Sequence, residues 1–174
     1  ERGAESLRRE FGLKTGPVGL YIGGLYREKR IDFLLEAAQR IRAAIPDFQL
    51  IIGGAGPQQD MVEAAAREHS WICYAGPVQG KRKAAVLALA DIMLNPGVVG
   101  LGVLDSFVGG APMFTADEGL RSPEIAYLAS GRNGVVTKPD LDVYVDAAVS
   151  TLSDPKALKA LQEGALAMAS RYTI

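Results

Sequence analysis

The sequence predicts an α/β fold: a doubly wound parallel sheet of about six strands with helices on both faces. Short apolar runs alternate with helical patterns along the whole chain, and most of the runs are bounded by glycine or proline. The runs are continuous and do not alternate apolar with polar residues. Continuous apolar strands are buried on both faces, as in parallel sheets that are covered by helices.

The first half of the chain supplies three strands and two helices. Residues 18–22 form an apolar run that ends at two glycines. The helix over 31–45 has apolar residues at helical spacing, with Asp32 near its start, where the helix dipole favours an acid. Strands over 50–52 and 72–75 enclose a second helix. Its expected apolar stripe is Met61, Val62 and Ala65.

The middle of the chain continues the alternation. A third helix is expected over 84–90, and strands follow over 92–94 and 113–115. Between these strands lies a fourth helix. Its expected apolar stripe is Leu101, Leu104 and Val108. The basic residues Lys81, Arg82 and Lys83 precede the third helix, where a solvated helix start is the ordinary interpretation.

The last third of the chain has two helix starts with recognisable chemistry. Ser122, Pro123 and Glu124 give an N-cap serine, a proline at the first helical position and an acid in the first turn. A strand over 135–137 and a helix over 141–152 come next. The final helix begins at Asp154-Pro155.

Length and charge limit the classes of protein. The 174 residues predict a single domain over 1–174, since domains cluster near roughly 100–150 residues. A formal net charge of −1 removes the broad attraction that holds nucleic-acid backbones, so we expect no nucleic-acid partner. No apolar run approaches the ~20 residues of a membrane-spanning helix. Because the chain begins without methionine, we expect it to be a fragment of a longer protein.

The stretch 95–112 carries the strongest functional signal. It is a strand end that breaks into a glycine-rich loop and then opens a helix, and backbone N–H groups in such a loop can hold a phosphate. Asp105 lies in the opening turns of that helix, so its carboxylate is directed back towards the loop. There it could accept both hydroxyls of a ribose. The alternative is that Asp105 only stabilises the helix dipole, by ~0.3–1 kcal/mol.

A second glycine turn, Gly23-Gly24-Leu25, follows the first strand. Lys29 is the best candidate there for a phosphate contact, because a cation and a helix start would act on the same anion. The alternative is a tight strand exit with solvated charges. Glu124 could likewise be a first-turn acid or a ligand contact. His69 has no second histidine to share a metal, and we predict no metal site.

Taken in order, several motifs resemble those of one enzyme family. They are Gly23-Gly24-Leu25 with Lys29, the turn 53–57, Gly76-Pro77-Val78, the block 96–112, Ser122-Pro123-Glu124-Ile125 and Asn133-Gly134-Val135-Val136. Together they resemble the C-terminal domain of the retaining glycosyltransferases of family four, in a divergent branch. Residues 7–13 are similar to the helix that joins this domain to its partner.

The resemblance implies a GT-B enzyme, in which two Rossmann-like domains face each other across a cleft. This chain would be the half that binds a nucleotide-sugar donor, without metal or other cofactor, and an N-terminal acceptor domain would be missing. In the family an arginine and a lysine hold the diphosphate, and two glutamates address the sugar and the ribose. Lys29 matches the lysine and Asp105 the second glutamate, whereas Gly24 and Gly97 replace the other two. Arg27 is a candidate to compensate.

The predicted site has Lys29 as the catalytic residue that stabilises the leaving diphosphate, and a set that binds the rest of the donor. The donor-binding residues are Gly23, Gly24, Arg27, Pro77, Val78, Gly97, Val99, Gly100, Leu101 and Asp105. The backbone near Pro77 and Val78 would face the base.

Two other functions remain open. The changes at Gly24 and Gly97 could mark a non-catalytic nucleotide-binding or regulatory module. The chain could also belong to a different GT-B enzyme, such as a nucleotide-sugar epimerase or a phosphorylase. The lone Cys73 cannot form an internal disulfide, so we expect a cytoplasmic protein, with contact to the inner membrane face through the missing domain as a further option.

Overall fold

The structure is a computed structural model that describes residues 2–119 and 122–172. It contains six strands at the predicted places, so the predicted alternation is confirmed. They are β1 (Val18–Ile22), β2 (Gln49–Gly53), β3 (Ile72–Gly76), β4 (Ile92–Leu94), β5 (Met113–Ala116) and β6 (Gly134–Thr137).

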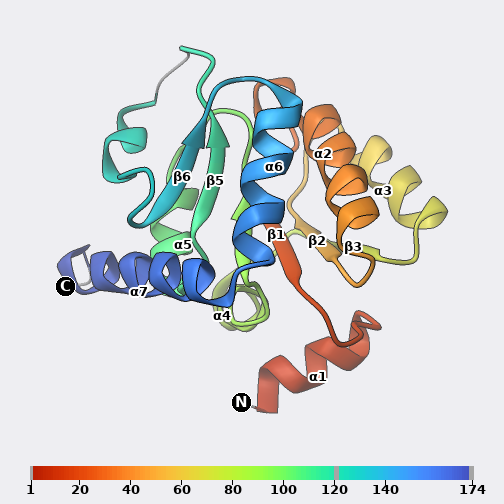
Figure 1. The fold of residues 1–174 in the computed structure, drawn as a ribbon. Helices are drawn as coiled ribbons and strands as arrows, with labels where there is room; N and C mark the ends of the chain where they lie inside the picture. Colours follow the sequence, from red (N-terminus) through yellow and green to blue (C-terminus); the bar gives the residue numbers. More distant parts are fainter. Residues whose placement is uncertain (1, 120–121, 173–174) are drawn as a thin grey trace.

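Helices connect the strands. The α-helices are α1 (Arg2–Glu10), α2 (Ile31–Ala44), α3 (Gln59–Glu68), α4 (Gly80–Leu87), α5 (Gly102–Gly109), α6 (Leu141–Leu152) and α7 (Pro155–Tyr172), and the short 3-10 helices are η1 (Arg27–Lys29) and η2 (Pro123–Tyr127). Figure 1 shows them on both sides of the sheet.

All strand pairs are parallel, and the sheet order is β3-β2-β1-β4-β5-β6. The chain builds outwards from β1 to β3 and then returns to place β4 on the other side of β1. The order therefore reverses between β1 and β4. In doubly wound sheets ligands bind outside the carboxyl ends of the strands at such a reversal. The topology thus points to the loops that follow β1 and β4.

Two apolar layers cover the sheet. One combines buried residues of α2, α3 and α6, with Phe48 and Tyr144 among its large side chains. The other combines residues of α1, α4, α5 and α7, centred on Val103 and Phe107 of α5. Because both faces are covered, the continuous apolar pattern of the strands is explained.

Several helix details differ from the predictions. In α5 the buried residues are Val103, Ser106 and Phe107, and the predicted Leu104 is partly buried against the same layer, whereas Leu101 and Val108 are 68% and 58% exposed. The helix begins only at Gly102, so the face that packs on the sheet passes through positions 103 and 107. Met61, predicted for the core, is 39% exposed.

Three predicted element boundaries also shift. α4 begins at Gly80, so the three basic residues 81–83 lie inside the helix rather than before it. The segment after Ser122 forms only a short 3-10 helix, η2. The N-terminal helix ends at Glu10, before the predicted 7–13 segment is complete.

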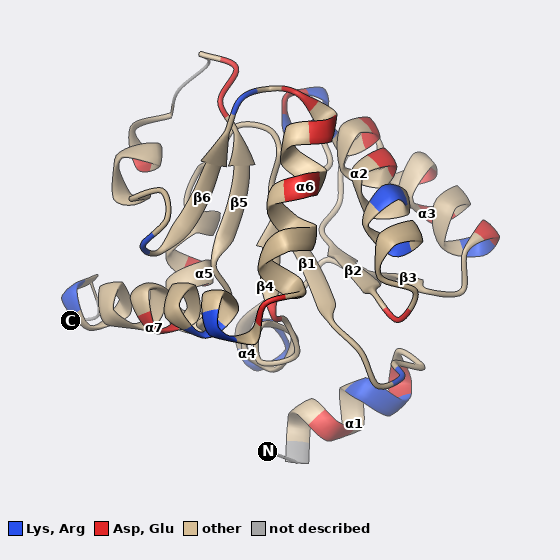
Figure 2. Ribbon diagram, in the orientation of Figure 1, with Lys and Arg blue, Asp and Glu red and all other residues tan. Residues whose placement is uncertain are grey.

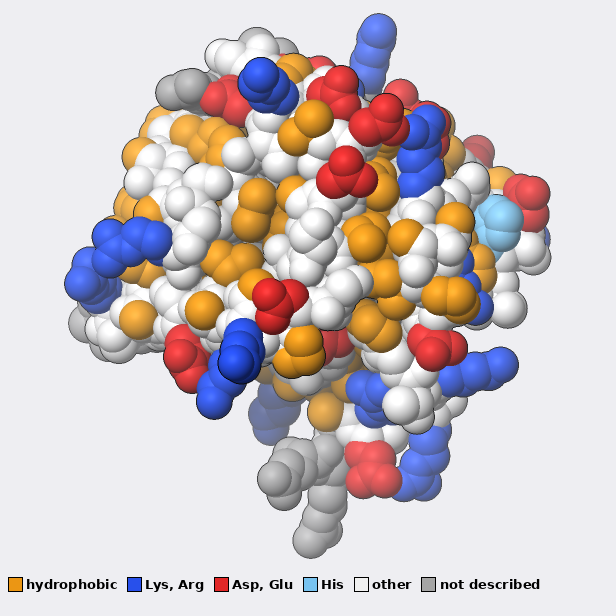
Figure 3. Space-filling model, in the orientation of Figure 1, with side chains coloured by type: hydrophobic (Ala, Val, Ile, Leu, Met, Phe, Trp, Pro, Cys, Tyr) orange, Lys and Arg blue, Asp and Glu red, His pale blue; other side chains and the backbone are white. Residues whose placement is uncertain are grey.

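Three helices have an acidic residue in the first turn. Asp32, Asp60 and Asp142 occupy the first turns of α2, α3 and α6, where they stabilise the helix dipoles. In Figure 2, acidic residues in red lie at the upper ends of α2 and α6. On the face drawn in Figure 3, Lys and Arg side chains are mixed with Asp and Glu.

Candidate functional site

The loops after β1 and β4 meet at the reversal of strand order. The N–H of Val98 donates to the carbonyl of Glu28 at 3.2 Å, and Lys29 Nζ donates to the carbonyl of Val98 at 2.5 Å. A Cβ placed on Gly100 would lie 3.5 Å from the same Nζ. The two glycine turns of the sequence therefore converge at one rim of the sheet, with the Lys29 side chain between them.

Gly97 has no room for a side chain. A Cβ at this position would overlap the carbonyl oxygen of Glu28 and lie 2.6 Å from Cα of Lys29. The glycine is therefore required by the close approach of the two loops. The sequence resemblance matches this position to the family's first glutamate, and the loop contact leaves no room for such a side chain here.

The Tyr26 ring packs against Gly24, the position that the sequence resemblance matches to the family's arginine. A Cβ on Gly24 would overlap the Tyr26 ring, which is half exposed, and the carbonyl of Gly24 accepts a hydrogen bond from Tyr21 Oη at 2.6 Å. The N–H of Gly23 donates to Gly53 at 3.0 Å. The amide of Gly23 is thus already bonded, and a phosphate contact from it would require that this bond open.

Lys29 is half-buried beneath the loop after β4. Burial lowers the pKa of Lys29 from its ordinary value, while the negative charge of Glu124 raises it. Glu124 belongs to η2, which packs against α5. The predicted cation therefore lies beside Gly100 before the start of α5, and η2 carries the acid whose charge acts on it.

Asp105 is held by a cation that the prediction did not pair with it. Its Oδ1 lies 2.7 Å from Lys83 Nζ of α4, and the two side chains are 25% and 33% exposed. The position of Lys83 inside α4 makes this pair geometrically available. Asp105 is near enough to solvent for a ligand to reach, but a ribose hydroxyl would have to replace Lys83.

Ser122 has a different partner from the predicted one. Its hydroxyl makes no cap bond to η2 and instead accepts the N–H of Gly100 at 3.2 Å. Ser122 is the N-cap residue of η2, with Pro123 and Glu124 in the first turn as predicted, but its hydroxyl bonds the loop before α5 and not the turn itself. That bond occupies one of the amides assigned to the phosphate.

The remaining predicted contacts are mostly backbone. Val78 and Val99 are 7% and 3% exposed, and their side chains belong to the apolar layer of α4 and α5. Only the main chain of these two residues can face a nucleotide, whereas Pro77 is exposed. Leu101 by contrast is largely exposed beside the loop.

A cavity of about 600 Å³ is lined by residues of the loops after β1 and β4. Of the predicted residues, Arg27, Gly97 and Val99 line it, whereas Lys29 and Asp105 do not. Its charged and polar lining includes Arg27, Arg30, Asp32, Gln58, Glu118 and Ser122. Such a mixture of donors and acceptors suits a ligand rich in hydroxyl groups.

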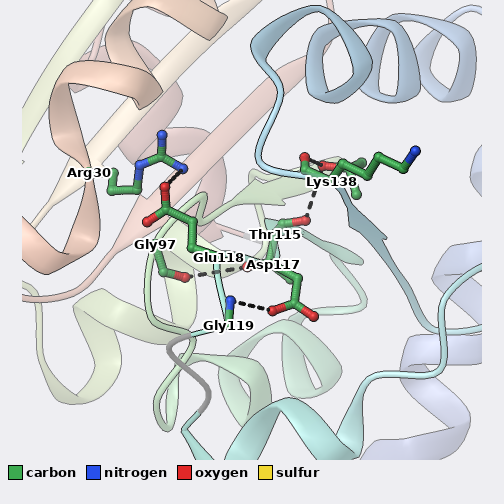
Figure 4. A network of polar contacts seen from close by, with 8 residues as sticks. Arg30, Gly97, Thr115, Asp117, Glu118, Gly119 and Lys138 are labelled. Atoms are coloured by element: carbon green, nitrogen blue, oxygen red, sulfur yellow. Dashed lines mark hydrogen bonds and ion pairs between the residues drawn. The ribbon is translucent and has the colours of Figure 1, made fainter.

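Arg30 is a charged residue of the cavity lining with two side-chain partners. Its guanidinium is 2.8 Å from Glu118 and lies 4.3 Å from the ring centroid of Phe33, and the residue has a left-handed backbone with φ 54°. Figure 4 shows Arg30 and Glu118 facing each other beside the loop that contains Gly97. Non-glycine residues with positive φ are uncommon and often occur at functional sites.

Side-chain hydrogen bonds link neighbouring strand ends beside this cavity. Thr115 Oγ1 donates to the carbonyl of Gly97 at 3.4 Å, and Thr137 Oγ1 donates to the carbonyl of Thr115 at 3.5 Å. The N–H of Gly119 donates to Asp117 at 2.9 Å. The loop after β4 is thereby held in place by β5.

Sequence reasoning did not single out Tyr26, Arg30 or Glu118. Tyr26 had a usable signal, since it follows the glycine turn Gly23-Gly24-Leu25 at the end of a strand that was expected to lie next to the ligand. Glu118 had none, because its ion pair with Arg30 joins residues far apart in the sequence. Among the described residues, no group of three or more His, Cys, Asp or Glu could hold a metal ion, and no helix is long and apolar enough to cross a membrane.

Comparisons with known proteins support one family. A family model described as glycosyl transferases group 1 matches residues 16–154. The GDP-mannose-dependent alpha-(1-6)-phosphatidylinositol monomannoside mannosyltransferase of Mycolicibacterium smegmatis is 28% identical over 171 residues, covering 89% of this chain and 44% of that protein. The alpha-D-kanosaminyltransferase of Streptomyces kanamyceticus is 24% identical, covering 97% and 45%. The chain spans about half the length of these relatives.

Solved structures agree on the fold. Anabaena Alr3699/HepE in complex with UDP-glucose superposes with a TM-score of 0.80 at 17% identity, covering 98% of this chain and 48% of that one. The C-terminal domain of a glycosyl transferase group 1 family protein (LpcC) from Francisella tularensis gives 0.74 at 16% identity, covering 95% and 91%. The predicted GT-B half is confirmed at the level of fold. With a family model that covers most of its length, the chain belongs to the glycosyl transferases group 1.

Proposed function

We propose that this chain is the donor-binding domain of a retaining glycosyltransferase that uses a nucleoside-diphosphate sugar. The observation that carries the proposal is the position of Lys29, which joins the loops after β1 and β4 where the order of strands reverses. Its ammonium group also lies beside Gly100, before the start of α5. Membership of the group 1 family supports it. So do the relatives, two of which are named as GDP-mannose-dependent enzymes, and the solved structures that hold UDP or UDP-glucose.

The proposed chemistry is stabilisation of the leaving group. When the bond between sugar and diphosphate breaks, negative charge grows on the phosphate oxygens. Lys29 and the N–H groups at the start of α5 stabilise this charge, and preorganised donors of this kind are the largest single contribution in many enzymes. The Lys29 ammonium must first exchange the Val98 carbonyl for a phosphate oxygen. We propose no metal in this step.

The proposed nucleoside site lies along α4 and α5. Asp105 accepts the ribose hydroxyls after its ion pair with Lys83 opens, and the backbone of Pro77 and Val78 faces the base. Exchange of a partly exposed ion pair for ligand bonds is favourable in this direction, because such a pair contributes only about 0–1 kcal/mol.

The acceptor and the second catalytic surface belong to an N-terminal domain in this proposal. The 174-residue chain should therefore bind donor and not transfer sugar by itself, and full turnover by this chain would contradict that part. We place the whole enzyme in the cytoplasm, where nucleotide sugars would reach it. Localisation of a tagged protein by cell fractionation tests this placement.

Titration calorimetry tests the proposed function. UDP, GDP and ADP, and then UDP-glucose and GDP-mannose, are titrated into the 174-residue chain. The proposal expects one nucleoside diphosphate to bind clearly better than the others, because the base faces a defined backbone. Absence of binding by every member of the panel would refute it.

A further inference from the structure

Arg30 carries a long side chain at a position where the backbone favours glycine. Its φ and ψ are both 54°, and among the described residues it is the single non-glycine residue with a positive φ. This left-handed conformation is unfavourable for a residue with a Cβ, whereas glycine adopts it freely. An arginine that is kept in such a conformation points to a role for its side chain.

The Arg30 guanidinium connects the loop after β1 to the loop after β5. Its Nη1 lies 2.8 Å from Glu118 Oε1, and the two side chains are 23% and 39% exposed. Figure 4 shows this pair beside the loop that contains Gly97. Partly exposed ion pairs contribute little to the stability of a fold. The effect of this pair is therefore expected on the relative position of the two loops.

The ion pair acts on the turn that carries the proposed phosphate-binding lysine. η1 ends at Lys29, and Arg30 is the next residue. The same turn contacts the loop after β4, because Lys29 Nζ donates to the carbonyl of Val98. In the proposed function the Lys29 ammonium gives up this contact for a phosphate oxygen. The pair of Arg30 with Glu118 does not involve Lys29, so it can persist through that exchange and continue to hold the turn.

We propose that Arg30 and Glu118 are positioning residues, whose ion pair holds η1 so that the Lys29 ammonium meets the diphosphate. This rests on the proposed function, and neither side chain needs to touch the nucleotide. Loss of the pair leaves the turn free to adopt more positions, and binding then has to order it, which lowers the affinity. The affinity falls only as long as Lys29 is present, because the pair acts through Lys29.

A double-mutant cycle between positions 118 and 29 tests this proposal. Calorimetry measures the Kd of the nucleoside diphosphate that binds best to the 174-residue chain, for the unchanged chain, Glu118→Gln, Lys29→Met and the double variant. Glu118→Gln removes the charge at nearly constant size and should raise the Kd about five- to tenfold. In the Lys29→Met background the same change should alter the Kd by less than about twofold, because the group that the pair positions is absent.

Two further variants complete the experiment. Arg30→Gly breaks the same pair and introduces the residue that the left-handed backbone favours, so the domain should fold and the Kd should rise as in Glu118→Gln. Arg30→Gly also replaces Glu118→Gln in the cycle if that variant does not fold, which thermal unfolding monitors. Asp142→Asn is the matched control, since it removes an ion-pair partner of Arg40 on α2 and should leave the Kd unchanged.

The outcomes separate this proposal from the proposed function. If no nucleoside diphosphate binds the unchanged chain, the proposed function fails and the assignment of Arg30 and Glu118 fails with it. If the nucleotide binds but Glu118→Gln leaves the Kd unchanged, the assignment alone is overturned. An equal rise of the Kd in both backgrounds would show that the pair acts independently of Lys29, on the fold or on the ligand itself, and would overturn the assignment as well.

Discussion

Lys29 combines two properties that a surface lysine lacks. It is half-buried and it donates to the Val98 carbonyl, so its ammonium is held in a fixed place between the two loops. Desolvation is unfavourable for the charged form and lowers the pKa. Burial of this charge is unfavourable for folding, yet the residue lies where the order of strands reverses. A role in ligand binding explains such a lysine better than a contribution to the stability of the fold.

Replacement of Lys29 by methionine should separate binding from stability. In the folded state the pKa lies below the ordinary value of 10.5, so the unfolded state binds the proton more tightly. The free energy of unfolding is therefore reduced at pH values below the folded pKa and recovers as pH rises towards 10.5. Lys29→Met should keep or raise the Tm at neutral pH while nucleoside diphosphates bind about 10- to 100-fold more weakly. A large loss of Tm with unchanged affinity would contradict this.

The Lys83–Asp105 pair gives a second prediction at the residue scale. Asp105→Ala should weaken a ribonucleoside diphosphate about tenfold but leave its 2′,3′-dideoxy analogue unaffected, because only the hydroxyls need the carboxylate. Stability should change by less than about 1 kcal/mol, as expected for a partly exposed pair. Lys83→Met is the matched control and should not weaken binding, since it only frees Asp105. An equal loss in both variants would mean that the pair matters as a structural unit.

Among single residues, the sequence could place Lys29 and Asp105 only on their loop and helix. The resemblance identified both, yet it could not give their present partners, the Val98 carbonyl and Lys83. Those partners depend on how a long side chain lies across two other elements. The partner of Ser122 was equally unpredictable. The sequence pattern predicted a serine that caps the following turn, but its hydroxyl accepts the N–H of Gly100 from another loop.

At the scale of elements, the loops after β1 and β4 are determined by each other. Gly97 packs its Cα against the backbone of Glu28 and Lys29, so neither loop can move without the other. A glutamate at position 97, which the sequence resemblance to the family implies, would require a different loop arrangement. Its introduction here is therefore expected to disrupt the site rather than improve it.

The tight approach at Gly97 predicts a stability effect. Gly97→Ala should destabilise the domain by about 1–3 kcal/mol, because a methyl group would overlap backbone atoms that cannot rotate away. Gly102→Ala at the start of α5 is the matched control, since its Cβ would meet atoms only at 3.7 Å and beyond. The control should be neutral or stabilising by up to about 1 kcal/mol. Urea denaturation of both variants measures the difference, and equal stability would contradict the loop contact.

Strands were predictable to within a residue or two, and helix faces less so. A buried parallel strand such as β1 is continuously apolar and ends at glycine, which leaves little ambiguity. The predicted stripe of α5 was correct at Leu104, which packs against the core, and wrong at Leu101 and Val108, which are exposed. In an apolar helix every turn offers residues on several faces, and only packing on the sheet decides which face is buried.

At the scale of the whole molecule, the order of strands decides where function can lie. The reversal between β1 and β4 brings together two turns that are more than 60 residues apart in the sequence, and the alternation of elements was sufficient to predict this meeting. The cavity beside Arg30 was not predictable. It depends on the left-handed backbone at Arg30 and on the ion pair to Glu118.

The most direct test of the account is a crystal structure of the 174-residue chain with the nucleoside diphosphate that binds best in calorimetry. The account predicts the diphosphate against the start of α5, with Lys29 Nζ moved from the Val98 carbonyl to a phosphate oxygen and the ribose at Asp105. A diphosphate bound in the cavity at Arg27 and Arg30, with Lys29 still donating to Val98, would contradict it.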